Sequence, residues 1–560
     1  MRVRISARQS DLAKLQAYRV GEALKSVGAT EVTFQFRSSL GDLNQSDPLW
    51  KMPEKGVFTE DFVRDLTEGT ADMVVHSWKD LPTIQRVDTE IVATLPRADT
   101  RDLLLFRRDR LANHSADHDA SQGDGHLKIL TSSPRRAYNL EQFFLTHLPR
   151  PAKGTEWKSV EFQPVRGNIP TRLKKLLAQD VDGLIVAKAA LDRLIAAAEP
   201  EFAETQAVIR DVLAQTLFMV LPLSVNPTAA AQGALAIEIH KDRPELAALV
   251  AKLNCPKTFE AVVEERKILA LYGGGCHQKI GVTILERDYG KLTYLRGLTD
   301  RGERLDRLCL EAPAEAQALP GAVPEFIPES NASASSQSLA NEAIRIFPEA
   351  GEEGSFFERE LFTGTELEAT LGKLSGCPAI YVARENALPL EHHPASHQLI
   401  WTAGLRTWQK LAARGVWVNG SSESLGEREP MQIDALVQAQ GRQGSGSSGD
   451  QNSLEWTKVS HEDSARTSAS EFRSLATYRL KPRARLPDLR DRTHFYWMSG
   501  SSFERAVALF PEIQNKIHVS GPGHTHDFLV RALGSTALKE GRILIALDLE
   551  SWRNGFASHK

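Results

Sequence analysis

Short apolar runs alternate with amphipathic helical segments over the first 250 residues. Residues 3–5 and 33–36 have the pattern of strands, and Ser10 stands where it can cap a helix that stops at Gly28. A second helix is expected to begin at Thr59, with negative charge in its first turn, where it suits the helix dipole. Strands alternating with helices predict an α/β protein with mainly parallel, doubly wound sheets.

One predicted strand ends in charged residues. Residues 73–82 read MVVHSWKDLP, so an apolar run leads directly into Lys79 and Asp80. In doubly wound sheets, ligands lie beyond the carboxyl ends of the strands. We therefore expect Ser77, Lys79 and Asp80 to lie at a binding cleft. The simpler interpretation, that polar residues only mark the turn, is still open at this point.

Four tracts have the composition of loops or linkers. Residues 38–56, rich in Gly, Pro, Asn and Asp, predict a lid, because a loop of this length is otherwise unusual in a compact domain. Residues 115–125 predict a surface insertion, 330–338 an interdomain linker, and 440–453 a flexible segment.

Composition narrows the classes of function. The chain has 560 residues, 41% hydrophobic and 25% charged, which is typical of several globular domains. A net charge of −4 gives no overall attraction to nucleic acid or membrane, and no apolar run predicts a signal peptide or a membrane span, so we expect a cytoplasmic protein. Four scattered cysteines and loop histidines predict neither a disulfide framework nor a metal site.

Cations recur beside hydroxyl or glycine residues in several separated turns of the N-terminal half. They are Arg8 (next to Ser10), Lys51, Lys55, Lys79, Arg135, Arg136, Arg166 and Arg172. If these turns converge, the ligand must be a polyanion, and Arg and Lys both bind carboxylates. No phosphate-binding loop or aromatic-interleaved basic stripe is present, so a polycarboxylate fits better than a nucleotide or nucleic acid. The alternative is that each cation is a solvated surface charge.

A glycine-rich turn presents a cysteine. The segment ERKILALYGGGC is helical in pattern up to the three glycines that precede Cys276. Glycines permit positive φ angles and the close approach of a bulky group. A thiol presented on such a turn can serve as a nucleophile or an attachment point, whereas the alternative is a buried, inert cysteine.

Eight motifs in order resemble hydroxymethylbilane synthase, also called porphobilinogen deaminase. They are SARQSDLA, PLWKMPEKGVFTEDF, VVHSWKDLPT, ILTSSPRRAYNL, VRGNIPTRLKKL, DGLIVAKAALDRL, AAQGALAIE and ERKILALYGGGC, and they cover roughly residues 1–310. The resemblance implies an enzyme that joins four porphobilinogen units into a linear tetrapyrrole for heme biosynthesis and releases ammonia. Its partners would be porphobilinogen and the growing oligopyrrole, and we expect a monomer.

The resemblance also implies roles for individual residues. Cys276 would hold a covalent dipyrromethane cofactor by a thioether, and Asp80 would be the catalytic carboxylate that stabilises cationic pyrrole intermediates and moves protons. The positions implied to bind cofactor or substrate are Arg8, Ser10, Lys51, Lys55, Ser77, Lys79, Thr131, Ser132, Ser133, Arg135, Arg136, Arg166, Gly167, Asn168, Arg172, Gln232 and Gly275. No metal is implied.

The implied fold has two domains like those of periplasmic binding proteins and a small α+β domain that carries the cofactor. Domain 1 would comprise residues 1–99 with 228–252, domain 2 residues 103–226 and domain 3 residues 256–312, followed by a linker over 313–350. The chain departs from the family pattern by Ala231 in place of a glycine, and at Thr100, Ala190 and Lys279.

Residues 351–560 lie beyond the resemblance to the deaminase. Two segments, beginning LIWTAGLRTW and FYWMSGSSFE, repeat a strand–turn–helix–strand order that resembles uroporphyrinogen-III synthase, a two-lobed α/β enzyme. This implies cyclisation of the linear product to uroporphyrinogen III, with candidate contacts at Thr402, Ser499, Ser501 and Thr525. Two alternatives are open: the extension is structural and only the N-terminal part is catalytic, or the chain is a non-enzymatic two-lobed module that binds polycarboxylates.

Overall fold

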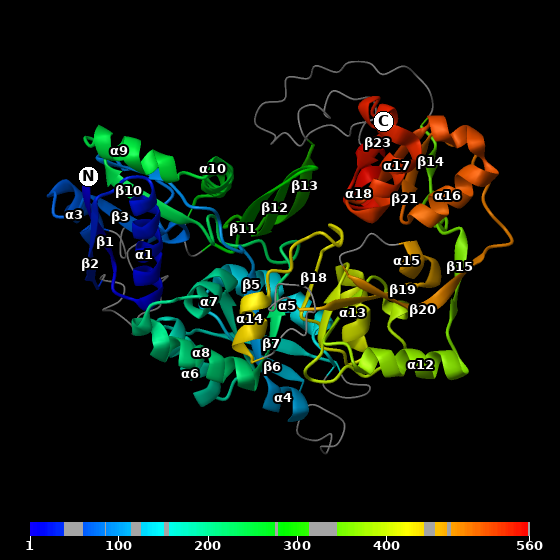
Figure 1. Cartoon of the computed structure of the whole chain (residues 1–560), viewed down its shortest axis with the longest axis horizontal. Coiled ribbons are helices and arrows are strands. Elements are labelled where there is room, and N and C mark those ends of the chain that lie inside the picture. The colour runs from blue at the N-terminus through cyan, green and yellow to red at the C-terminus, as the bar shows by residue number, and fades with distance from the viewer. Residues whose placement is uncertain are drawn as a thin grey trace.

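The computed structural model describes residues 1–38, 60–84, 86–113, 125–150, 156–274, 278–312, 344–441, 454–467 and 472–557 (Figure 1). Nearly all of the predicted lid, surface insertion and flexible segment, and all of residues 330–338, lie outside these ranges.

The first sheet has five strands in the order β2-β1-β3-β10-β4. Only β10 runs antiparallel to its neighbours, so the predicted parallel character holds for the other described strands. Alternate residues of β1 such as Val3 and Ile5 enter the core under the first helix. The elements are β1 (Arg2–Arg8), α1 (Asp11–Ser26), β2 (Glu31–Arg37), α3 (Glu60–Thr67), β3 (Met73–Ser77), η2 (Trp78–Asp80), β4 (Thr89–Ala93), β10 (Leu235–His240), α9 (Pro244–Val250) and η4 (Ala251–Leu253).

The second sheet repeats this topology in the order β7-β6-β8-β5-β9, with β5 as its antiparallel strand. Successive β5 side chains point to opposite faces: Leu103 and Leu105 enter one apolar core, and Leu104 and Phe106 enter another. The elements are β5 (Asp102–Arg107), α4 (Arg108–Asn113), β6 (His126–Leu130), α5 (Pro134–His147), β7 (Ser159–Gln163), α6 (Ile169–Ala178), β8 (Gly183–Ala187), α7 (Lys188–Ile195), η3 (Pro200–Phe202), α8 (Ala203–Gln215) and β9 (Thr216–Val220).

Two crossings join the sheets. Residues 94–101 lead from β4 to β5, and residues 221–234 lead from β9 back to β10. A third, antiparallel sheet then follows one helix; its elements are α10 (Pro256–Leu271), β11 (Gly281–Arg287), β12 (Gly290–Leu298) and β13 (Arg304–Glu311).

The C-terminal extension contains a six-stranded sheet, β15-β20-β19-β16-β17-β18, and a four-stranded sheet, β14-β21-β22-β23. The former comprises β15 (Phe357–Leu361), α12 (Gly364–Ser375), β16 (Ala379–Val382), η5 (Glu385–Ala387), β17 (Leu399–Thr402), α13 (Leu405–Ala413), β18 (Gly420–Ser421), α14 (Asp434–Ala439), β19 (Trp456–His461), α15 (Glu462–Thr467) and β20 (Arg473–Pro482). The latter comprises β14 (Ile346–Phe347), β21 (His494–Trp497), α16 (Gly500–Leu509), η6 (Pro511–Asn515), β22 (Ile517–Ser520), α17 (His524–Lys539), β23 (Ile543–Ile545) and α18 (Leu549–Ala557).

The extension packs directly on the second sheet and its helices (Figure 1). The Trp408 indole lies edge-on to Phe143, with ring centroids 5.2 Å apart, and donates a hydrogen bond to the His147 carbonyl at 2.9 Å. Leu104 and Phe106 of β5 share one apolar core with these rings. The two parts of the chain are therefore joined by buried side chains.

The α/β class predicted from the sequence is confirmed, and the helices and strands expected in the first 40 residues are present. Two details differ. Ser10 occupies the position before α1, but its side chain makes no capping hydrogen bond. Within the predicted linker over 313–350, the apolar pair Ile346–Phe347 forms β14 and pairs with β21. The domain boundaries and the likeness to periplasmic binding proteins are still predictions.

Candidate functional site

Asp80 stands in a tight turn that directly follows a strand. Strand β3 leads into η2, where the buried Trp78 packs on Phe259 of α10 with ring centroids 5.2 Å apart. The Arg266 guanidinium donates to the Trp78 and Leu81 carbonyls at 3.4 and 3.2 Å. With Trp78 anchored, Asp80 is left exposed at the end of the strand.

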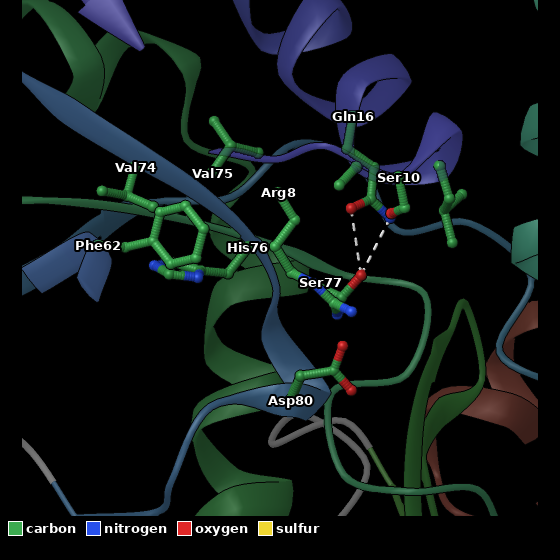
Figure 2. Close-up of a pocket in the computed structure, with 11 residues that line it drawn as sticks. Arg8, Ser10, Gln16, Phe62, Val74, Val75, His76, Ser77 and Asp80 are labelled. Atoms are coloured by element: carbon green, nitrogen blue, oxygen red, sulfur yellow. Dashed lines mark hydrogen bonds between the residues drawn. The ribbon is translucent and has the colours of Figure 1, made fainter. Parts of the chain in front are cut away.

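A small cavity of about 70 Å³ lies beside this turn (Figure 2). Arg8 from the end of β1 lines it together with Ser10, Ser77 and Asp80. The Ser77 hydroxyl lies 3.0–3.1 Å from the Gln16 side-chain amide, which fixes the end of β3 to α1. Four of the predicted site residues therefore meet at one edge of the first sheet.

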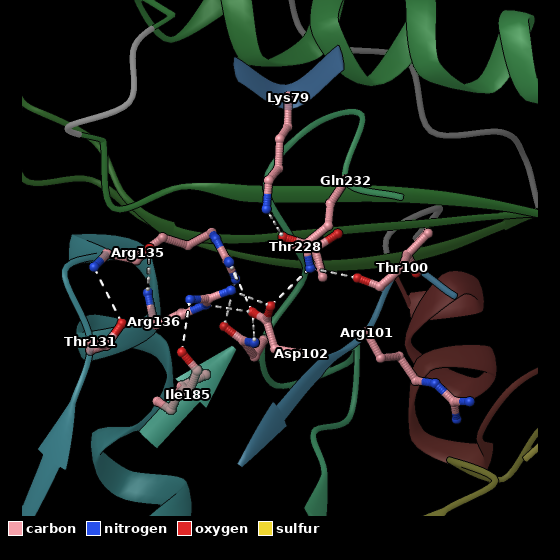
Figure 3. Close-up of polar contacts among 12 residues, drawn as sticks. Lys79, Thr100, Arg101, Asp102, Thr131, Arg135, Arg136, Ile185, Thr228 and Gln232 are labelled. Carbon is pink, nitrogen blue, oxygen red and sulfur yellow. Dashed lines mark hydrogen bonds and ion pairs between the residues drawn. The ribbon is translucent and has the colours of Figure 1, made fainter. Parts of the chain in front are cut away.

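Lys79 points from the first sheet toward the crossings (Figure 3). Its ammonium donates to the Gln232 Oε1 atom at 3.2 Å. Burial lowers the pKa of Lys79 to about 8, the Asp80 charge opposes this, and the Arg136 charge adds to it. Among the described residues, no carboxylate lies within ion-pair distance of Lys79.

Arg135 and Arg136 stand in the first turn of α5, and both bind the buried carboxylate of Asp102. Arg136 is bidentate, with 2.6 and 3.0 Å contacts, and Arg135 adds one contact at 2.9 Å. Asn226 and Gln232 donate to the same carboxylate at 2.9 and 2.8 Å (Figure 3).

Charge in this cluster is not balanced. Burial alone raises the pKa of Asp102, but the charges of Arg136 and Arg135 and the hydrogen bonds lower it far below its usual range. The carboxylate is thus ionised, yet among the described residues only it and the exposed Asp80 face the two guanidinium groups and the nearby Lys79 ammonium. Buried cations need counter-charges, so the cluster is suited to an anionic ligand.

The turn after β7 supplies further cations. Gly167 has φ of +108°, which a side chain would strain, and Asn168 caps α6 by accepting a hydrogen bond from the Thr171 N–H at 3.0 Å. Arg172 donates to the Gly167 carbonyl at 2.8 Å. Burial, followed by the charges of Arg136 and Arg166, lowers the pKa of Arg172 to about 10; the Asp80 charge opposes this shift.

The hydroxyl residues before α5 act within the protein. Ser132 donates to the Val165 carbonyl at 2.6 Å and accepts from the Val165 N–H at 2.9 Å, which joins the two cation-bearing loops. Ser133 caps α5 by accepting from the Arg136 N–H at 3.5 Å, and Thr131 accepts from the Ser133 N–H at 3.3 Å. These contacts position the loops.

The remaining predicted site residues, Lys51, Lys55, Gly275 and Cys276, lie outside the described residues. The two glycines that precede Gly275 are described, and both take positive φ angles, +101° at Gly273 and +53° at Gly274. A Cβ atom added to Gly274 would lie 2.5 Å from the Thr83 hydroxyl. The glycine turn therefore approaches the chain three residues beyond Asp80.

Sequence reasoning missed Asp102 and Asn226 as members of the cluster. The available signal for Asp102 was an aspartate immediately before a fully apolar run. In the extension, the candidate Thr402 is fully buried and donates to the Gly420 carbonyl at 3.5 Å, so it does not face a ligand. Ser499 caps α16 through the Ser502 N–H at 3.3 Å.

No helix among the described residues is long and apolar enough to cross a membrane, and the same residues contain no group of three potential acidic, histidine or cysteine metal ligands.

Together, the fold and the site define an α/β protein with two sheets of like topology and a group of cations gathered around a buried carboxylate between them. Residues 3–248 match the family model described as "Porphobilinogen deaminase, dipyromethane cofactor binding domain". The chain belongs to the porphobilinogen deaminase family, and dipyrromethane is the cofactor of that domain.

Relatives of the chain are named as porphobilinogen deaminases. The chain is 30% identical to a probable porphobilinogen deaminase of Methanopyrus kandleri, over 53% of this chain and 87% of the relative. It is 32% identical to the porphobilinogen deaminase of Synechococcus elongatus (56% and 87%) and 35% identical to that of Acidothermus cellulolyticus (50% and 74%). About half of the chain lies outside these matches.

Solved structures that the chain matches include an ancestral arginine-binding protein, with 10% identity and a TM-score of 0.23 over 49% of this chain and 98% of that one. Another is an arginine 3rd transport system periplasmic binding protein from Legionella pneumophila, with 12% identity and a TM-score of 0.22 over 49% and 98%.

Proposed function

We propose that the first 312 residues polymerise four porphobilinogen units into hydroxymethylbilane, with release of ammonia, on a dipyrromethane that Cys276 holds by a thioether. The observation that carries this proposal is the excess of buried cations around Asp102 beside the exposed Asp80. Each pyrrole ring brings one acetate and one propionate, so the ligand supplies the missing negative charge. Family membership supports the same activity.

The residues present fit the cofactor. Lys79 and Arg172 form no ion pair among the described residues, and both have lowered pKa values that a carboxylate partner would raise again. We assign them, with Arg8, Arg135, Arg136 and Arg166, to the carboxylates of cofactor and substrate. Bound dipyrromethane supplies the nucleophilic pyrrole carbon to which the first substrate is joined.

Asp80 is assigned to the chemistry of each incoming unit. Loss of ammonia from porphobilinogen breaks a carbon–nitrogen bond and leaves a cation on the substrate. The Asp80 carboxylate can accept a hydrogen bond from the pyrrole N–H and stabilise that charge. After the new carbon–carbon bond forms, the same carboxylate can take the proton lost from the ring carbon and return it to solvent.

The intact mass of the purified chain tests this function. We expect an excess equal to two pyrrole units, which Cys276→Ser abolishes. Cys309→Ser, a half-buried cysteine of β13, is the matched control and should keep the added mass. An unmodified wild-type chain that releases no ammonia from porphobilinogen would favour the non-enzymatic polycarboxylate-binding alternative.

For the extension we propose a second activity, cyclisation of hydroxymethylbilane to uroporphyrinogen III. A partly buried guanidinium supports it: Arg384 stands two residues beyond the end of β16, which runs parallel to β19. Burial lowers the pKa of Arg384, and the charge of Arg359 lowers it further. A guanidinium beyond the carboxyl end of a parallel strand suits a carboxylate ligand.

A further inference from the structure

One segment of the extension contacts both crossings between the first two sheets. We call residues 417–432 the clamp; they include β18 and lead toward α14. The first contact is at the edge strand β9, where the Val220 N–H donates to the Asn419 carbonyl at 2.8 Å. The Asn419 side-chain amide donates in turn to the Phe218 carbonyl at 2.9 Å.

The clamp holds the second crossing through Glu423. The half-buried carboxylate of Glu423 accepts hydrogen bonds from the backbone N–H groups of Leu223 and Ser224 at 2.8 and 2.7 Å. Its φ of +50° is an unfavourable conformation for a residue with a side chain, which the surrounding contacts maintain. Burial raises the pKa of Glu423, the two hydrogen bonds oppose that rise, and together these bonds fix the start of residues 221–234.

The first crossing is held through Arg101. Its guanidinium pairs with Asp99, at 2.9 Å through Nε and 2.8 Å through Nη2, and also donates to the Met431 carbonyl at 2.7 Å. Lys188 of α7 lies 3.3 Å from the Asp99 carboxylate and donates to the Gln432 carbonyl. The end of the clamp is thus bonded to residues 99–101.

The residues next to Arg101 face the opposite way, toward the cation cluster. The Thr100 carbonyl and the Asp102 carboxylate both accept from the Gln232 side-chain amide, at 2.7 and 2.8 Å. Figure 3 shows Arg101 directed away from Asp102 and Gln232. One short stretch of backbone therefore connects the clamp on one side with the predicted site on the other.

The clamp also reaches the third sheet. Arg287 of β11 is paired with Glu429, with 2.9 Å between Nε and Oε2, and Leu425 packs with Leu223 and Tyr294. The second crossing is therefore enclosed between the extension and the sheet that follows α10.

We propose that the clamp sets the angle between the first two sheets during chain elongation, and that Glu423 is a positioning residue of the deaminase reaction. This proposal rests on the deaminase function proposed above, and it holds whether or not the extension cyclises the product. Each added unit brings two more carboxylates into the space between the sheets, so elongation depends on how the crossings are held. Because Glu423 binds backbone N–H groups at the start of the second crossing, we assign its effect on the reaction to the positions of Thr100, Asp102 and Gln232.

The test uses the full-length, cofactor-loaded chain with Glu423→Gln, which keeps the shape but loses the charge. We expect backbone exchange at residues 223 and 224 to accelerate roughly tenfold, as weaker hydrogen bonds would allow. The kcat for porphobilinogen should fall roughly three- to tenfold with KM unchanged and cofactor mass intact, and partly elongated intermediates should accumulate. Glu385→Gln, in an exposed pair with Lys410, is the matched control and should leave all of these unchanged.

Accelerated exchange with wild-type kcat and no accumulated intermediates would overturn the proposal. If Glu423→Gln does not fold, Arg287→Gln opens the clamp at the third sheet; a smaller fall in kcat is expected, and wild-type kcat would overturn the proposal. A wild-type chain that carries no cofactor and consumes no porphobilinogen would contradict the deaminase function itself. An active wild type with an equally active Glu423→Gln would contradict only the role of the clamp.

Discussion

The Oδ1 atom of Asp102 lies 2.8 Å from the Nε2 atom of Gln232, whose Oε1 atom accepts a hydrogen bond from Lys79. A carboxylate at the start of the second sheet is thus linked through one amide to the turn that carries Asp80. This link makes Asp102 the centre of the predicted site without any contact between it and Asp80.

Asp102→Asn should destabilise the chain and weaken cofactor retention. The amide cannot neutralise Arg135 and Arg136, and removing one partner of a buried ion pair costs about 3–5 kcal/mol. Urea unfolding and intact mass measure the two effects. Asp109→Asn, in a more exposed pair with Arg107, should change neither; equal effects of both variants would contradict a special role for Asp102.

Asp80→Asn should fold normally and keep its cofactor, because the Asp80 side chain is exposed. Turnover of porphobilinogen should fall by roughly 10²–10⁴, the usual contribution of a positioned acid–base group. Ammonia release in a single turnover measures this step, with the exposed Asp88→Asn as control. Turnover within a few-fold of wild type would remove Asp80 from the proposed chemistry.

Lys79 should make activity sensitive to alkaline pH. Its pKa of about 8 is below that of an unfolded lysine, so between pH 8 and 10.5 the unfolded chain binds more protons, and unfolding free energy rises with pH. The affinity for a carboxylate ligand falls over the same pH range, because Lys79 loses its positive charge. We expect porphobilinogen binding by Cys276→Ser to weaken above pH 8, and Lys79→Arg to abolish that weakening. The same pH dependence of binding in Cys276→Ser with and without Lys79→Arg would contradict this role of Lys79.

The extension is tested by the isomer of the cyclic product. The wild-type chain given porphobilinogen should form uroporphyrinogen III, whereas Arg384→Gln should shift the product toward the type I isomer that forms spontaneously, with hydroxymethylbilane formation unchanged. Arg406→Gln, at an exposed position on α13, serves as control. Type I product from the wild type would mean that the extension is structural.

Glu427 should stabilise the extension in a pH-dependent manner. Burial alone raises its pKa, but the hydrogen bond with His524 and the charge of Lys458 lower it to about 2. Because the unfolded value is higher, this stabilisation is complete above about pH 5 and is lost as pH falls toward 2. Glu427→Gln should therefore cost about 2–3 kcal/mol at pH 7 and little at pH 2, by urea unfolding. A cost independent of pH would contradict this.

Sequence patterns located the cation-bearing turns because each follows an apolar strand, and strand ends of one sheet meet at one edge. They did not show that Arg135 and Arg136 share the Asp102 carboxylate, since Asp102 is separated from them by 33 and 34 positions. Nor did they show that the Ser132 hydroxyl joins two loops through Val165.

The contacts of the clamp could not be predicted from the sequence either. Arg101 meets Met431 across 330 positions, and the contact depends on how two sheets pack. Local patterns show which face of a strand is apolar, but they do not show which other part of the chain packs against that face.

The shared core beneath Trp408 has a consequence for how such a chain could arise and be divided. Phe106 and Phe143 are covered by the extension, so a fragment ending near residue 312 would present these rings to water. A gene split between the two halves would need compensating surface changes before either product stayed soluble. The two halves are therefore constrained to change together, as a single unit of selection.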